Sequence, residues 1–300
     1  MMGGFWAPEL KYAGYDKLIL RGKSPDLVYL WINNDTVEIR DASHLQGKGA
    51  IETAELIKKE LKQPKAQVSA IGLAGENRVF YASIEQGRSS ASRGGIGAVM
   101  GDKGVKAIAV RGTRDINVAR PAEFMALCYE VLDYIKWRED NPIPGVIPIL
   151  AILGSPQEMA IHDEKWHTEN FSWGNARLRR KGFWTEEVSD EWLETMNKAR
   201  TRLISCYNCP VACGATISMP GLPTYMMKCF TKLTYTMAAM SDLDFGLRIA
   251  QRATEYGVDG YSTPQVMAFA IELYENGILT DEDMPGMPSD NDDRFYWLLE

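Results

Sequence analysis

The sequence has 300 residues, 45% hydrophobic and 24% charged, and its 33 basic and 40 acidic side chains give a formal net charge of −7. This acidic balance argues against a nucleic-acid partner, because binding to phosphate backbones needs a basic surface. No apolar run reaches the roughly 18 residues that a membrane helix needs, and no secretory leader opens the chain. We therefore expect a cytoplasmic protein without a membrane span.

The first third of the sequence alternates apolar residues with turn residues, as paired strands do. Asn33–Asp35 is a turn between two such runs, which predicts a hairpin. A helix is expected from Ala50 to Leu61, ended by Pro64. The pattern predicts a β-rich domain over residues 1–112. Its expected strands are 18–20, 27–32, 36–40, 67–71, 79–84 and 106–110.

The segment from Gly87 to Gly101 is rich in glycine and small hydroxyl residues. Such a backbone can approach a ligand closely, and Arg88 and Arg93 are suited to holding phosphate. It matches neither the dinucleotide-binding fingerprint nor a P-loop. The segment indicates a phosphorylated cofactor, and a flexible connection is the alternative.

After Gly112 the apolar spacing changes to the helical period. A helix is expected from Pro121 to Ile135, with Cys128 on its apolar side and therefore in the core. The sequence thus predicts an α+β fold, with a largely helical domain over residues 113–300. Both ends look like cuts through a longer fold, which indicates an interior piece of a longer protein. The other expected helices are 155–165, 187–199, 242–256 and 263–276.

Three cysteines, Cys206, Cys209 and Cys213, are spaced C-x2-C-x3-C in one short loop. Thiolates at this spacing can hold three corners of a 4Fe-4S cluster, with a fourth ligand from outside this sequence. The clustering also fits a reducing compartment. Structural zinc is the chief alternative, although no second C-x2-C knuckle is present. Three unrelated core cysteines are the remaining alternative.

A second group of reactive side chains lies in one expected helix. Glu158 and His162 are four residues apart and would share a helix face, and His167 follows one or two turns later. Such a set can bind a divalent metal such as zinc or transfer a proton, because imidazole titrates near neutral pH. A pair that only stabilises an exposed helix is the alternative.

Together these motifs resemble one family, the tungsten-containing aldehyde ferredoxin oxidoreductases. They span nearly the whole sequence in the family's order, and the glycine-rich motifs are the most specific of them. The motifs that carry the resemblance are 8–16, Ala74–Asn77, Arg93–Gly101 with Lys106–Gly112, Cys206–Cys213 and Tyr256–Ser262.

The resemblance implies a tungsten ion held by two pyranopterins, magnesium bridging the pterin phosphates, and a 4Fe-4S cluster close by. It also implies a longer chain, whose missing part would supply the fourth cluster cysteine. The glycine-rich loop would bind pterin phosphate, and Asp259 would accept hydrogen bonds from a pterin ring, since charge-assisted bonds are strong. The implied cofactor-binding residues are Arg88, Arg93, Gly94, Gly95, Gly97 and Asp259.

The sequence departs from the aldehyde-oxidising members after the cysteine loop. No carboxylate occurs from Cys206 to Ser241, and Cys229 stands where those relatives carry acidic residues near the metal. Soft metals select sulfur, so Cys229 is a candidate tungsten ligand, with simple packing as the alternative.

This departure, together with Glu158, His162 and His167, is most similar to the tungsten subunits of one branch of the family, the class II benzoyl-CoA reductases. That resemblance implies reduction of an aromatic acyl-CoA to a cyclic diene. Electrons would come from an iron–sulfur partner subunit in a hetero-oligomer. His167 would protonate the ring, while Glu158 and His162 relay protons or bind zinc.

Two other functions remain open at this point. The first keeps the family and oxidises aldehydes to carboxylic acids, with an acidic residue from the missing part of the chain. The second is an electron-transfer module that binds only the iron–sulfur cluster. The glycine-rich loop and Asp259 argue against the second, because an electron carrier needs no pterin contacts.

Overall fold

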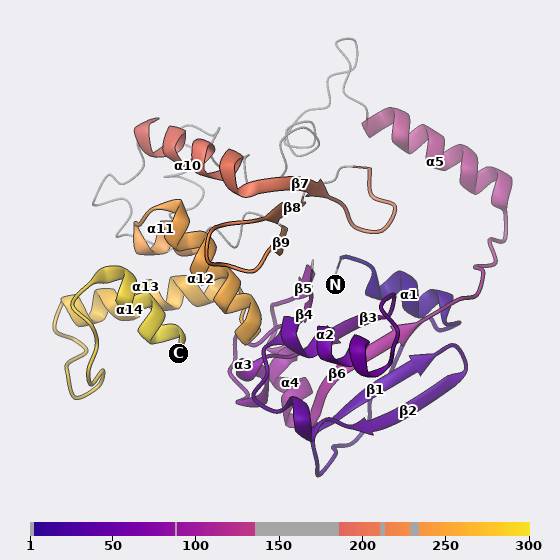
Figure 1. The fold of residues 1–300 in the computed structure, drawn as a ribbon, viewed down its shortest axis with the longest axis horizontal. Helices are drawn as coiled ribbons and strands as arrows, with labels where there is room; N and C mark the ends of the chain where they lie inside the picture. Colours follow the sequence, from indigo (N-terminus) through magenta and orange to yellow (C-terminus); the bar gives the residue numbers. More distant parts are fainter. Residues whose placement is uncertain (1–2, 88, 136–185, 211–213, 229–233) are drawn as a thin grey trace.

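The computed structural model describes residues 3–87, 89–135, 186–210, 214–228 and 234–300 (Figure 1). A six-stranded sheet with its helices precedes a part built mainly of helices, so the predicted α+β fold is confirmed. The strands of the larger sheet are β1 Val28–Asn33, β2 Thr36–Asp41, β3 Gln67–Ala70, β4 Ile84–Gln86, β5 Ser89–Ala91 and β6 Val105–Arg111.

The larger sheet is ordered β2-β1-β6-β3-β4-β5, so its last strand in the sequence lies in the middle. β1 and β6 run parallel, and the other neighbouring strands pair antiparallel. Four consecutive residues of β1 are buried, as are five of the seven residues of β6. Long apolar runs of this kind occur where both faces of a sheet are covered.

Short helices cover this sheet. α2 buries Ala50, Thr53, Ala54 and Ile57, and the residues of β3 pack against it. The apolar residues at helical spacing in α2 therefore form the face that is buried against the sheet. The helices of this region are α1 Trp6–Tyr12, the single turn Ser43–Leu45, α2 Ala50–Glu60, α3 Leu73–Glu76 and α4 Ile96–Asp102.

Helices α3 and α4 touch each other through their backbones. A Cβ atom placed on Gly101 would lie 1.8 Å from the carbonyl oxygen of Gly75. One placed on Gly97 would lie 2.6 Å from the carbonyl carbon of Ala82 and from the carbonyl oxygen of Ser83. Only glycine fits where two backbones approach this closely. These two glycines therefore fix where the glycine-rich segment lies on the sheet.

The second part of the chain consists mainly of helices and includes a smaller antiparallel sheet of β7, β8 and β9 (Figure 1). Its helical core is apolar and includes Tyr235, Phe245, Ile249, Ile271 and Phe295. The elements are α5 Pro121–Ile135, α10 Glu186–Ala199, β7 Arg200–Ile204, β8 Gly214–Ile217, β9 Tyr225–Lys228, α11 Thr234–Ala239, α12 Leu243–Tyr256, α13 Ser262–Glu275 and α14 Asn291–Leu299.

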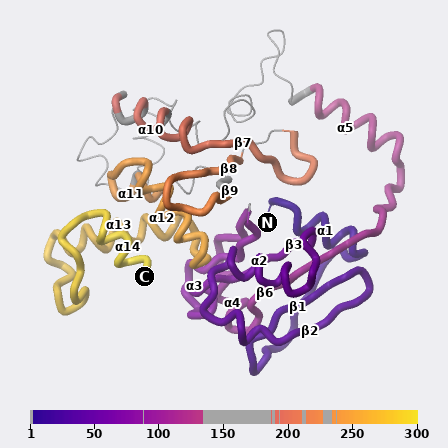
Figure 2. Tube along the Cα trace, in the orientation of Figure 1, coloured from indigo at the N-terminus to yellow at the C-terminus, as the bar shows by residue number. Residues whose placement is uncertain are grey.

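The end of α12 joins the two parts (Figure 2). The Glu255 carboxylate accepts the backbone N–H groups of Ile51 and Glu52 at 3.1 and 3.4 Å, at the start of α2. The Ser83 N–H donates to the Gly257 carbonyl at 2.7 Å. Burial raises the pKa of the Glu255 carboxyl above its usual value. The loop after α12 is thereby held against the glycine-rich segment.

Three local predictions were wrong. Residues 18–20 form no strand, because both edges of β1 are already paired with β2 and β6. The strand expected at 79–84 begins only at Ile84, because α3 and the left-handed Arg78 (φ 58°) fill the space before it. The apolar side of α5 is exposed rather than in the core, with Leu127 at 55% and Cys128 only half-buried.

The other expected helices differ in how far the structure addresses them. Those at 121–135, 187–199, 242–256 and 263–276 correspond to α5, α10, α12 and α13. The helix expected at 155–165 lies outside the described residues. Within the described part of the chain, every helix is too short or too polar to cross a membrane.

Candidate functional site

The glycine-rich segment leaves the sheet as a hairpin and returns as a helix. β4 and β5 pair across a turn that contains Gly87, whose φ is 54°. Gly94 and Gly95 follow with φ of 88° and 66°, a left-handed conformation that other residues adopt at a cost. A Cβ atom on Gly94 would meet no atom within 4 Å. The backbone at Gly94 is therefore open to a ligand.

Arg93 is the one cation in this segment whose position the structure describes. Its Nε lies 4.0 Å from Oδ2 of Asp259, and its guanidinium carbon lies 4.6 Å from the centre of the Tyr261 ring. The side chain is still 65% exposed, so the guanidinium keeps donors for another anion. Contact with an aromatic face limits where such a side chain can swing.

Asp259 is almost fully buried and tightly held. Its Oδ2 accepts the Ser262 N–H at 2.8 Å, and its own N–H donates to the Tyr81 carbonyl at 2.8 Å. Asp259 is thus bonded through its backbone to Tyr81 and through its side chain to the first residue of α13. This fixed geometry leaves lone pairs of the carboxylate for a donor on a ligand.

These residues surround a cavity of about 520 Å³. It offers a guanidinium, serine hydroxyls and a carboxylate, and the open backbone of Gly94 directly follows Arg93 in the sequence. A ligand that carries both phosphate oxygens and ring N–H groups fits this donor set. The lining residues are Ser90, Ala91, Ser92, Arg93, Ile96, Asp259 and Tyr261.

A buried ion pair supports the segment from behind. The Lys106 ammonium is fully buried, donates to the Lys48 carbonyl at 2.7 Å and pairs with the Glu76 carboxylate. Desolvation lowers the pKa of Lys106, while Glu76 opposes that shift. Glu76 ends α3, which packs on α4. The pair therefore ties β6 to the helices that carry the loop.

Two of the candidate cluster cysteines lie in one turn. The Cys209 N–H donates to the Cys206 carbonyl at 3.1 Å, and Asn208 between them is left-handed with φ 50°. Both thiols are half-buried, and neither forms a disulfide with a described residue. Ile204 of β7 pairs with Gly214 of β8, so the whole cysteine loop connects two adjacent strands. Soft thiolates held this way suit an iron–sulfur cluster.

The predicted site residues divide into two groups. The structure brings Arg93 and Asp259 together around one cavity, whereas Gly94 and Gly95 line a separate one beside Lys23. Gly97 is required by the packing of α4. Sequence reasoning did not assign Tyr261 to the site. Its position two residues after Asp259 was the signal that could have placed it there. Among the described residues no group of three metal-binding side chains occurs. Outside the described residues lie Arg88, Glu158, His162, His167, Cys213 and Cys229.

Comparisons with known proteins cover almost the whole chain. The family model for the aldehyde ferredoxin oxidoreductase N-terminal domain matches residues 1–112, and the model for domains 2 and 3 of the same family matches residues 133–300. The tungsten-containing aldehyde ferredoxin oxidoreductase of Pyrococcus horikoshii is 35% identical over 295 residues, and that of Thermococcus kodakarensis is 36% identical over 298 residues. Each alignment covers 95% of this chain and 46% of the relative.

One solved structure is much more similar. It is the active-site complex BamBC of benzoyl coenzyme A reductase in complex with 1,5-dienoyl-CoA. A chain of that complex is 80% identical to this one with a TM-score of 0.91. The match covers 100% of this chain and 46% of the other, so this chain spans about half the length of the proteins it matches.

Proposed function

Because the chain belongs to the aldehyde ferredoxin oxidoreductase family, as its motifs predicted, we propose that it is part of the tungsten subunit of a benzoyl-CoA reductase. The observation that carries this proposal is the 80% identity with a chain of the benzoyl coenzyme A reductase complex. The enzyme would add an electron pair and a pair of protons to the aromatic ring, giving a cyclic dienoyl-CoA. Its cytoplasmic location stays a prediction.

The cofactor proposed for the cavity at Arg93 is a tungsten ion held by two pyranopterins, with magnesium between the pterin phosphates. Bound there, it would supply a metal that takes up and releases electrons at low potential. In this proposal Arg93 and Arg88 bind phosphate, and the backbone at Gly94 and Gly95 lets the phosphate come close. Asp259 orients the pterin ring by accepting its N–H groups.

Two domains divide these tasks in the proposal. Residues 1–112 carry the phosphate-binding loop, and residues 113–300 carry Asp259 and the cluster loop. Cys206, Cys209 and Cys213 would hold three corners of a 4Fe-4S cluster, with the fourth ligand from outside this chain. An iron–sulfur partner subunit would deliver the electrons, which makes the enzyme a hetero-oligomer.

The proton transfer and the protein's own sulfur ligand to tungsten are assigned to residues outside the described part of the chain. His167 would protonate the ring, and Glu158 and His162 would relay protons or bind zinc. Cys229 would bind the tungsten ion directly. Aromatic reduction couples electrons to protons, so a proton donor beside the metal is required in any case.

The test is elemental analysis of the full-length complex purified without oxygen, combined with X-ray absorption at the tungsten edge. We expect tungsten, iron, about five sulfur neighbours of tungsten, and benzoyl-CoA-dependent oxidation of a reduced electron donor. Four sulfur neighbours with oxidation of aldehydes would support the alternative function of aldehyde oxidation, which the name of the 35% identical relative favours. Iron without tungsten would leave only the electron-transfer module.

A further inference from the structure

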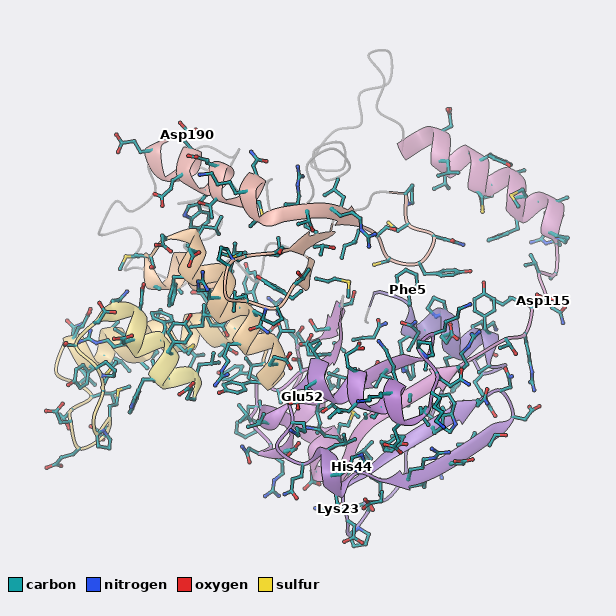
Figure 3. The ribbon with its side chains drawn as sticks, viewed as in Figure 1. Phe5, Lys23, His44, Glu52, Asp115 and Asp190 are labelled. Atoms are coloured by element: carbon teal, nitrogen blue, oxygen red, sulfur yellow. The ribbon has the colours of Figure 1, made fainter. Side chains whose placement is uncertain are left out.

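Tyr207 stands between the two described cluster cysteines and points away from them toward the start of the chain. Its ring meets the Phe5 ring edge to face at 6.1 Å and the Tyr12 ring at 6.1 Å, with interplanar angles of 89° and 73°. Edge-to-face pairs add stability beyond the area they bury. Figure 3 shows Phe5 on the side of the sheet region that faces the loop after β7.

Hydrogen bonds reinforce this aromatic contact. The Tyr207 hydroxyl is bonded to the Tyr12 hydroxyl, and the Tyr207 backbone N–H donates to the Gly4 carbonyl at 3.3 Å. The residue is therefore attached at both its backbone and the tip of its side chain. Both attachments lead to residues 4–12, which belong to the sheet region.

The same short segment is fixed to the hairpin that carries the proposed pterin loop. The Phe5 N–H donates to Oε1 of Gln86 at 3.2 Å, and a Cβ atom on Gly4 would lie 2.2 Å from that oxygen. The Gln86 amide in turn donates to Gln67 at 2.9 Å. Gln86 is buried and ends β4, directly before the turn at Gly87. Residues 4–5 thus touch the cluster turn on one side and the β4–β5 hairpin on the other.

We propose that Tyr207 is a positioning residue that holds the turn of Cys206 and Cys209 at a fixed distance from the β4–β5 hairpin, through Phe5 and Tyr12. This inference rests on the proposed function, in which electrons pass from the cluster to the pterin. Electron transfer slows as the distance between the two redox centres grows, so the separation set by the turn enters the rate of this step. A ring that locks the turn therefore controls the rate of that step.

The test compares four variants of the full-length holoenzyme complex: Tyr207→Phe, Tyr12→Phe, the double variant, and Tyr207→Ala. The first readouts are the magnetic coupling between reduced cluster and tungsten in electron paramagnetic resonance, and the rate at which substrate reoxidises the cluster. Tyr207→Ala is expected to change the coupling and to slow reoxidation several-fold. Each single Phe variant is expected to slow it by the same smaller factor. The double variant is expected to add nothing, because both remove one hydrogen bond.

Metal content separates the possible failures. Wild-type complex without iron or tungsten would overturn the proposed function itself. Normal metals with unchanged coupling in all four variants would overturn the positioning role alone. Loss of iron in Tyr207→Ala, while Tyr207→Phe behaves like the wild type, would also overturn it, because Tyr207 would then only maintain the loop's fold. Additive effects of the two Phe substitutions would overturn the role of the hydroxyl pair.

Discussion

The sheet region (residues 3–112) and the helical region (residues 234–300) are stabilised by different contacts. The sheet region buries a charged pair, Lys106 with Glu76, and packs backbone against backbone at Gly97 and Gly101. The helical region buries a cluster of apolar side chains, among them Ile271 at 0% exposure. Apolar side chains of similar volume can replace one another, whereas a buried charge or a glycine contact cannot. The glycine-rich loop that carries Arg93 belongs to the less replaceable region, whereas Asp259 belongs to the helical one.

Lys106→Met shares the largest expected effect with Gly101→Ala. The Lys106→Met substitution removes the cation from the Glu76 carboxylate, which is only 14% exposed and keeps the Gly47 N–H as a donor, and we expect the free energy of unfolding to fall by about 3 kcal/mol. Urea unfolding of the holoprotein, followed by circular dichroism, measures it. Lys48→Gln is the matched control, because the Lys48–Glu52 pair at 2.9 Å is half exposed and contributes about 0.3–0.5 kcal/mol. Equal losses in both variants would contradict the comparison.

Gly101→Ala is expected to cost about 3 kcal/mol, because the added methyl group collides with the Gly75 carbonyl of α3. The thermal midpoint of the holoprotein reports it. Gly277→Ala is the control, since that glycine is left-handed with φ 68° and a Cβ atom placed on it would meet no atom within 4 Å. It should lose only about 1 kcal/mol of backbone strain. A smaller loss at Gly101 would show that α3 and α4 can move apart.

Ile271→Val probes the helical region and is expected to cost about 1 kcal/mol, the usual loss for one buried methylene group. The same denaturant titration gives the value. Ile278→Val, at a side chain that is 67% exposed, should change the free energy of unfolding by under about 0.5 kcal/mol. A cost at Ile271 as large as that at Gly101 would mean that the two regions are equally intolerant.

Glu255→Gln tests the junction between the regions, through pH. Burial raises the pKa of the folded Glu255 carboxyl, and the hydrogen bonds from the backbone N–H groups of Glu52 and Ile51 oppose that rise without cancelling it. The folded state then binds the proton more tightly than the unfolded state, so this contribution is complete below the unfolded pKa and is lost as pH rises through the folded pKa. As pH rises from 4 to 8, the unfolding midpoint of the wild-type protein should therefore fall relative to that of the Gln variant. Parallel curves would contradict the assignment.

The long amphipathic elements could be predicted from the sequence, and the short ones could not. α2, α10, α12 and α13 follow from apolar spacing because each buries a continuous face. α3 and α4 have four and seven residues, and their glycines are poor helix formers, so tertiary contacts rather than propensity make them helical. The sheet of β7, β8 and β9 was missed because its strands are short and interrupted by turns.

The candidate site was predicted in part for the same reason. Arg93 was found because a glycine-rich motif is visible locally, and Asp259 was found through the family resemblance. Their approach to 4.0 Å depends on the docking of α12 beside α2. Tyr261 and Tyr207 were missed because an aromatic residue in a loop resembles ordinary packing. Their contacts with Arg93 and Tyr12 appear only in three dimensions.

The position of β6 sets the order in which the protein can form during synthesis. Its two neighbours, β1 and β3, precede it in the sequence, yet neither pairs with the other. Until the ribosome has released residues as far as Arg111, the β1–β2 hairpin and the β3–β4–β5 strands lack the strand with which both of them pair. Pairing over such separations is slow and leaves strand edges exposed. The sheet therefore closes in one late step, and Lys106 enters the interior together with the strand that closes it.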